Sequence, residues 1–128
     1  MADAFNDPTR KVVVLGASPK PDRYAFKAMR MLLAHGFDAV PVNPAFREIL
    51  SRTCYRSIAE VPVPIDTITM YLSSKRSEAL VEEIIHSKPQ RIVFNPGAEN
   101  ARLEYEAAKH GIKTIHGCTL IMLQSGEF

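Results

Sequence analysis

The sequence predicts an α/β protein with a three-layer Rossmann-like fold, in which about five parallel strands are covered by helices on both faces. Short β-branched runs alternate with amphipathic stretches of about ten residues, and a parallel sheet needs such crossover helices. The runs are mostly apolar, as in strands that are buried on both faces. The length of 128 residues, 46% of them hydrophobic and 23% charged, fits one domain.

The elements follow one another without a second domain boundary. The predicted strands lie at residues 11–15, 38–44, 65–72, 91–94 and 113–115. The predicted helices run from an N-cap at Asp22 to His35, from Ser73 or Ser74 to His86, through Leu103 to His110, and over 119–124. The segment 45–64 is irregular, with a short edge extension at 54–55 and a helical turn at 57–61. Residues 1–10 form an N-terminal extension, and residues 11–128 form the domain.

The net charge of +2 hides a local excess of basic residues. Residues 10–30 hold six Lys or Arg side chains and one acid, so this segment carries +5 and the rest of the chain −3. Such a segment on a nearly neutral protein suits a small anionic ligand, whereas nucleic-acid binders usually carry basic residues over a whole face. A solvated helix face rich in Lys and Arg is the alternative interpretation.

Several classes of protein are excluded. Two cysteines 64 positions apart, Cys54 and Cys118, indicate neither a structural zinc site nor a disulfide framework. The apolar stretches are too short to span a bilayer, and the N-terminus has no apolar signal segment. We therefore expect a cytoplasmic protein with no membrane and no nucleic-acid partner.

Glycine, proline and small polar residues gather just after the predicted strands. Gly16, Gly97 and Gly117 follow the first, fourth and fifth strands, while Asn43-Pro44 and Ser73-Ser74 follow the second and third. The carboxyl ends of parallel strands share one edge of the sheet, where loops present backbone N–H groups and helix N-termini face a crevice. The pattern therefore predicts a ligand site at that edge.

The loop after the first strand resembles a phosphate cradle. Gly16 allows a tight turn, Ser18 offers a hydroxyl and Arg23 adds a fixed positive charge. The dinucleotide fingerprint is absent, because Ser18 and Pro21 stand where G-x-G-x-x-G needs glycine, and Asn43 stands where an acid would grip the ribose. The loop also lacks the G-K-[ST] of a Walker motif.

Catalytic arrangements have little support in the sequence. Three of the four histidines are at predicted helix C-termini, where an imidazolium complements the helix dipole: His35, His86 and His110. His116 and Cys118 suggest a thiol and base pair, but no carboxylate close in sequence orients the ring. A turn histidine beside a packed cysteine is therefore favoured.

Taken together, these residues resemble a known family, the stand-alone CoA-binding proteins of Rossmann type, which are similar to the CoA-binding N-terminal domain of the succinyl-CoA synthetase α subunit. The resemblance rests on VVVLGAS, PVNP, an Asp-Thr-Ile strand start, FNPGAEN and GCTLIML, in that order, over residues 11–128. It implies that coenzyme A or an acyl-CoA lies along the carboxyl edge of the sheet. We expect no ligase activity, because the phosphorylated histidine of the synthetase belongs to a further domain.

The resemblance also implies roles for individual residues. Gly16, Ala17 and Ser18 would hold the diphosphate, with Arg23 in support. Val42, Asn43 and Pro44 would border the nucleotide, and Tyr71, Leu72 and Ser73 would line its other side, although a core position is the alternative for Tyr71. Asn95, Pro96 and Gly97 would face the pantetheine arm, with Cys118 near its thiol end. The synthetase has a Lys at the position of Phe46, and Arg47 is the expected substitute.

We therefore predict non-enzymatic binding of coenzyme A or acyl-CoA, by a chain for which a homo-oligomer remains open. Two enzymes are the alternatives. A nicotinamide-dinucleotide-dependent oxidoreductase is opposed by the missing glycines and by Asn43. A Cys-dependent acyl-CoA thioesterase that uses Cys118 and His116 is opposed by the missing orienting acid. A mixed disulfide between Cys118 and CoA is a further hypothesis.

Overall fold

A computed structural model describes residues 10–128, so that residues 1–9 of the predicted N-terminal extension lie outside the described residues. Its centre is a five-stranded sheet in the order β2-β1-β5-β6-β7, with every neighbouring pair parallel. The strands are β1 (Lys11–Leu15), β2 (Asp38–Val42), β5 (Thr67–Met70), β6 (Arg91–Phe94) and β7 (Lys113–His116). The predicted fold class is confirmed.

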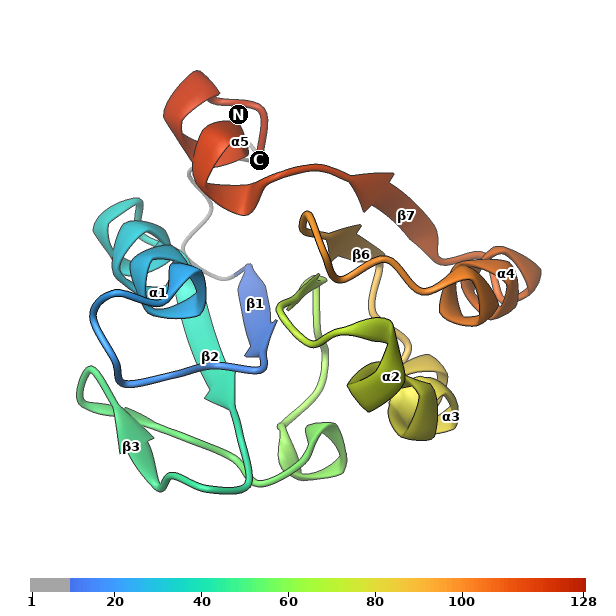
Figure 1. The fold of residues 1–128 in the computed structure, drawn as a ribbon, viewed down its shortest axis with the longest axis horizontal. Helices are drawn as coiled ribbons and strands as arrows, with labels where there is room; N and C mark the ends of the chain where they lie inside the picture. The colour runs from blue at the N-terminus through green and yellow to red at the C-terminus, as the bar shows by residue number, and fades with distance from the viewer. Residues whose placement is uncertain (1–9) are drawn as a thin grey trace.

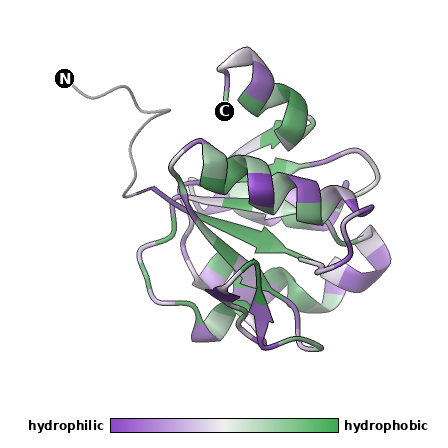
Figure 2. Cartoon of the chain, turned by 90° about the vertical axis from the view of Figure 1, so that its left-hand side faces the viewer, coloured by the Kyte–Doolittle hydropathy of each residue, from purple (hydrophilic) through white to green (hydrophobic). Residues whose placement is uncertain are grey.

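Helices cover both faces of this sheet (Figure 1). One face packs against α1 (Tyr24–Ala34) and α5 (Thr119–Ser125), and the other against α3 (Val81–His86) and α4 (Ala101–Lys109). The short α2 (Ser74–Ser77) and two 3₁₀ turns, Ile58–Glu60 and Glu78–Leu80, complete the second layer. Figure 2 shows the hydrophobic residues concentrated along the strands between the layers.

The alternation of side chains along each strand divides the core in two. Val12 and Val14 face α1 and α5, and Val13 faces α3 and α4. All three are fully buried. This double burial explains why the strands read as continuous apolar runs in the sequence.

The chain leaves β1 for β2 on one side and then crosses back to β5 on the other side of β1. In open parallel sheets, ligands bind outside the carboxyl ends of the strands where the order reverses. The carboxyl ends of β1 and β5 are therefore the expected centre of a site.

The segment 45–64 has more structure than the sequence indicates. A small antiparallel hairpin pairs β3 (Glu48–Ile49) with β4 (Arg52–Thr53), and its turn residues Leu50 and Ser51 have φ of 52° and 61°. A Leu-Ser pair is not a usual sequence for such a turn, which is why the hairpin was not predicted. The predicted edge extension is confirmed by a parallel bridge between Val42 and Tyr55. The helical turn is confirmed at Ile58–Glu60.

One helix start differs from the prediction. The N-cap of α1 is Arg23 rather than Asp22, and no side chain caps it. The Arg23 N–H donates to the Lys20 carbonyl oxygen at 3.1 Å, and this turn leaves Asp22 outside the helix. The prediction for α2 is confirmed, because Ser73 is the N-cap and accepts a hydrogen bond from the Arg76 N–H.

The described part of the chain contains no helix that is both long and apolar enough to cross a membrane.

Candidate functional site

Two adjacent pockets open at the carboxyl ends of β1 and β5. The first, the cradle pocket, has a volume of about 490 Å³ and lies between the loop after β1 and the loop after β6. The second, the apolar pocket, has a volume of about 420 Å³ and lies between the end of β2 and α2. The two pockets share Gly16, Asn43, Leu72 and Arg76.

The structure brings together every predicted contact residue except Cys118. The cradle pocket is lined by Gly16, Ala17, Ser18, Arg23, Asn43, Tyr71, Leu72, Ser73, Asn95, Pro96 and Gly97. The apolar pocket is lined by Gly16, Val42, Asn43, Pro44 and Leu72. Cys118 is the N-cap of α5 and lines neither pocket.

A ridge formed by Gly16 and Leu72 lies between the two pockets. Gly16 has φ of +91°, a conformation that side-chain-bearing residues rarely adopt. A Cβ atom at this position would be 2.9 Å from Leu72 Cδ2 and 3.1 Å from the Tyr71 carbonyl carbon. Both the backbone conformation and the close approach of β5 therefore require glycine at the point where β1 ends.

The backbone of the cradle loop is used differently from the expectation. The N–H groups of Gly16 and Ala17 both donate to the Val42 carbonyl oxygen, at 3.1 and 3.2 Å, so they are not free donors for a phosphate. The Ser18 hydroxyl oxygen accepts a hydrogen bond from the Lys20 N–H at 3.1 Å. Its O–H hydrogen remains available to donate toward a ligand.

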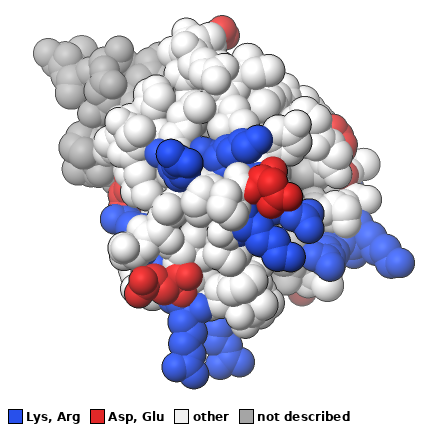
Figure 3. Space-filling model, turned by 60° about the vertical axis from the view of Figure 1, so that its left-hand side comes forward, with Lys and Arg blue, Asp and Glu red and all other residues white. Residues whose placement is uncertain are grey.

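Positive charge surrounds the cradle pocket. Lys20, Arg23 and Arg76 line it and are exposed, and Arg23 stands at the N-terminus of α1, where the helix dipole is also positive. Figure 3 shows Lys and Arg side chains outnumbering acidic ones on the face of the molecule that carries α1. Arg76 was not predicted as a site residue, because its place in the pocket wall depends on where α2 lies relative to the loop after β1.

The side chain of Asn43 holds the loops in place. Its Nδ2 donates to the Ala17 carbonyl oxygen at 2.8 Å, and its Oδ1 accepts from the Ala45 N–H at 2.9 Å. Both ends of the amide are thus used by the loops after β1 and β2. Asn43 lines both pockets, and its amide positions the cradle loop.

Asn95 belongs to a buried hydrogen-bond network beneath the cradle pocket. Its Nδ2 donates to Thr69 Oγ1 at 2.7 Å and to the Met70 carbonyl oxygen at 2.8 Å, while its Oδ1 accepts from the Thr119 N–H at 2.8 Å. The two threonine hydroxyls lie 2.7 Å apart. The network joins β5, β6 and the start of α5, so the Asn95 amide shapes the floor of the pocket.

Tyr71 is partly in the core and partly in the pocket. Its ring packs with the buried residues beneath α1 and α5, yet it also lines the cradle pocket. The phenolic oxygen is buried and has no hydrogen bond within residues 10–128. Burial raises the pKa of Tyr71 to about 12, and the nearby Thr119 and Thr69 hydroxyls offset part of that rise.

An acid orients His116 after all. The His116 Nε2 lies 3.0 Å from Glu104 Oε2, and the imidazole stacks on Phe94 with a centroid separation of 5.3 Å. Glu104 belongs to α4, twelve residues upstream, and only the packing of α4 beside β7 brings it to the ring. The expectation that no carboxylate orients His116 is wrong. Neither His116 nor Glu104 lines the two pockets.

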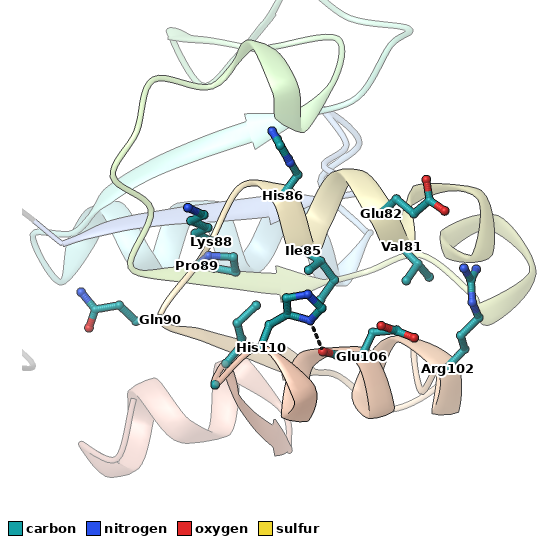
Figure 4. Close-up of a pocket in the computed structure, with 12 residues that line it drawn as sticks. Val81, Glu82, Ile85, His86, Lys88, Pro89, Gln90, Arg102, Glu106 and His110 are labelled. Atoms are coloured by element: carbon teal, nitrogen blue, oxygen red, sulfur yellow. Dashed lines mark hydrogen bonds between the residues drawn. The ribbon is translucent and has the colours of Figure 1, made fainter.

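A further cavity, of about 630 Å³, lies between α3 and α4 and reaches the opposite edge of the sheet. Figure 4 shows the His110 ring between these helices, with its Nδ1 2.8 Å from the Glu106 carbonyl oxygen. The cavity runs along both helices, and its wall holds two acids, Glu82 and Glu106, against two cations, Lys88 and Arg102. Over the described part of the chain, the lining of the cradle pocket, by contrast, includes cations and no acid. The cavity between α3 and α4 therefore suits an anionic ligand less well than the carboxyl edge does.

Two curated proteins are similar to this chain in sequence. The chain is 27% identical over 107 residues to the uncharacterized protein YneT of Bacillus subtilis, covering 84% of this chain and 78% of that protein. It is 30% identical over 114 residues to an ADP-forming acetate–CoA ligase of Archaeoglobus fulgidus, covering 81% of this chain. That alignment spans only 17% of the ligase.

A solved structure and a family model complete the comparison. The crystal structure of an uncharacterized protein is 38% identical with a TM-score of 0.85, and the alignment covers 94% of this chain and 98% of that one. The model of the CoA binding domain family matches residues 10–124. Because this match includes every strand and helix described above except the last residue of α5, the chain belongs to the CoA binding domain family.

Proposed function

We propose that this chain binds coenzyme A or an acyl-CoA at the carboxyl edge of its sheet and performs no chemistry on it. One observation carries the proposal: a cation-lined pocket and an apolar pocket meet at the Gly16 ridge, where the strand order reverses. Coenzyme A has a matching division, since a charged diphosphate joins its adenosine to its pantetheine arm. Family membership supports the same ligand class.

Different residues of the two pockets suit different parts of coenzyme A. The Ser18 hydroxyl, Lys20 and Arg23 offer a diphosphate a hydrogen-bond donor and two cations. The apolar pocket, with Val42 and Leu72 in its wall, offers a purine a dry surface. The other end of the cradle pocket, which is lined by Asn95, Pro96 and Gly97, accommodates the pantetheine arm.

Calorimetric titration of the purified chain with CoA, acetyl-CoA, NAD and NADP tests the proposal. We expect saturable binding of CoA and acetyl-CoA and no binding of the two dinucleotides. Binding of NAD without binding of CoA would overturn the proposal in favour of the oxidoreductase alternative. Thermal unfolding gives a second readout, because a ligand that binds only the folded state raises Tm.

The His116–Glu104 contact favours one competing function, a Cys-dependent acyl-CoA thioesterase. Such a hydrolase uses a thiol, an imidazole and an acid that orients the imidazole, and the His116–Glu104 contact supplies the last two. Within residues 10–128, no hydrogen bond joins His116 to Cys118. Free thiol release from acetyl-CoA, followed with a thiol reagent, tests it. Hydrolysis by the native chain that is lost in both Cys118→Ala and His116→Ala would establish the enzyme, whereas bound but intact acetyl-CoA supports the binding function.

A further inference from the structure

We propose that Arg56 and Arg76 form a second phosphate subsite, which binds the 3′-phosphate of coenzyme A and makes the chain selective against dephospho-CoA. The inference rests on the proposed function and assigns specificity to two residues at the rim of the apolar pocket. Neither residue is prominent in the sequence, because Arg56 lies in the irregular segment and Arg76 lies in a four-residue helix.

The apolar pocket contains more positive charge than a purine needs. Its wall is built mainly from Leu15, Val42, Ile58, Leu72 and Leu80, yet Arg56 and Arg76 also line it. An adenine ring is uncharged and gains little from two guanidinium groups. Two exposed cations in the lining of a mainly apolar pocket therefore indicate a ligand that has an anionic group next to its apolar part.

Both guanidinium groups remain available to a ligand. Three other arginines are paired with acids: Arg10 with Asp66, Arg52 with Asp38, and Arg102 with Glu78. Within residues 10–128, no hydrogen bond or ion pair engages the guanidinium of Arg56 or Arg76, and both residues are exposed. Their backbones are nevertheless fixed: the Arg56 N–H donates to Glu60 Oε1 at 3.3 Å, and the Arg76 N–H donates to Ser73.

One acid also lines the apolar pocket and must be counted. Glu83 is half-buried, and its Oε1 accepts a hydrogen bond from the Ala59 N–H at 3.0 Å. This bond draws the carboxylate toward the 3₁₀ turn Ile58–Glu60. With one acid against two arginines, the lining of the pocket keeps an excess of positive charge.

The placement of the cations matches the placement of charge in coenzyme A. A 3′-phosphorylated adenosine diphosphate carries its diphosphate on one side of the ribose and a phosphate monoester on the other. Lys20 and Arg23 line only the cradle pocket, Arg56 lines only the apolar pocket, and Arg76 lines both. The cations thus form two groups that share Arg76, one for each of the two anionic groups of the ligand, and arginine is the side chain best suited to phosphate oxygens.

Calorimetry with CoA and dephospho-CoA, which differ only in the 3′-phosphate, tests the subsite. We expect the native chain to bind CoA at least about tenfold more tightly, the scale of one charge-assisted contact. Arg56→Ala is expected to weaken CoA binding by about tenfold and leave dephospho-CoA binding unchanged. Arg76→Ala is expected to weaken CoA binding more than dephospho-CoA binding, and Arg23→Ala to weaken both equally.

Lys75→Ala is the matched control, because Lys75 precedes Arg76 in α2, is exposed, and lines neither pocket. Equal affinity of the native chain for the two nucleotides would overturn the subsite while leaving the proposed function standing. Equal losses for both nucleotides in Arg56→Ala would also overturn it. If the native chain bound neither nucleotide, the proposed function itself would fail and the subsite with it.

Discussion

The side-chain amide of Asn43 donates a hydrogen bond to the carbonyl oxygen of Ala17 at 2.8 Å, and this bond joins the loop after β2 to the loop after β1. The same amide accepts from the Ala45 N–H. The shape of the cradle pocket therefore depends on a residue whose side-chain amide is bonded to the loops after β1 and β2.

Asn43→Ala is expected to lower both stability and affinity for CoA. It removes two hydrogen bonds at a half-buried position, and we expect the free energy of unfolding to fall by about 1 to 3 kcal/mol. Urea unfolding and calorimetry measure the two effects. Asn43→Asp separates the bonds, because it keeps the acceptor for Ala45 but places a carboxylate oxygen against the Ala17 carbonyl. A loss of affinity with unchanged stability would mean that Asn43 touches the ligand directly.

Gly16→Ala is expected to destabilise the fold more than a glycine-to-alanine substitution at another position with positive φ. The new Cβ would meet Leu72 at 2.9 Å and would also force alanine to φ of +91°. We expect a destabilisation of about 2 to 4 kcal/mol, the sum of backbone strain and overpacking, together with loss of CoA binding.

Gly36→Ala is the control for Gly16→Ala. Gly36 has φ of +85° but open space around its Cα, so the control isolates the backbone term. It should cost about 1 kcal/mol and leave affinity intact. Similar losses of stability for the two variants, measured by urea unfolding, would show that the contact with Leu72 is unimportant.

The sequence is sufficient for the sheet and for the edge at which the site lies. After a basic first residue, Lys11 or Arg91, the runs 11–15 and 91–94 are apolar because both faces of each strand are covered, so that their composition and short length predict strands. The residues after each strand could likewise be assigned to one edge, because parallel strands end together.

What the sequence could not provide are contacts between distant elements. Glu104 reaches His116 only because α4 packs beside β7, and Arg76 enters the site only because α2 lies next to the Gly16 ridge. The direction of a side chain is equally hidden: nothing in NPGAEN indicates that the Asn95 amide points down into the Thr69–Thr119 network.

Arg23→Ala is expected to weaken CoA binding by about 1 to 3 kcal/mol, because a cation at the α1 N-terminus is lost from the cradle pocket. Arg30→Ala on the same helix is the control, since Arg30 is exposed and lines neither pocket. If binding weakens equally in both variants, general attraction to the basic face explains the effect. The loss in Arg23→Ala should shrink as salt is added but exceed the control at every concentration.

Tyr71→Phe is expected to stabilise the fold slightly, because it removes a buried hydroxyl that has no hydrogen-bond partner within residues 10–128. At neutral pH we expect the free energy of unfolding to rise by up to about 1 kcal/mol, since no hydrogen bond is lost when the hydroxyl is removed. The ring still lines the cradle pocket, so CoA affinity should stay within about twofold of the native value.

The pH dependence of the difference in stability between Tyr71→Phe and the native chain provides a sharper test. The pKa of Tyr71 is about 12 in the folded chain against 10.0 for an ordinary tyrosine, with burial as the main cause. The stability that comes from keeping the phenol neutral is therefore fully present below pH 10 and is lost as the pH rises toward 12. Phenylalanine does not ionise, so the advantage of Tyr71→Phe should be constant up to about pH 10 and widen above it.

Urea unfolding of both chains at several values between pH 8 and 11 measures this widening. Tyr105→Phe is the control, because the Tyr105 side chain is 65% exposed on α4. Its difference from the native chain should show much less change with pH. A Tyr71→Phe difference that stays flat through pH 11 would mean that the phenol ionises as readily in the folded chain as in the unfolded one, and that the space around its oxygen is open to water.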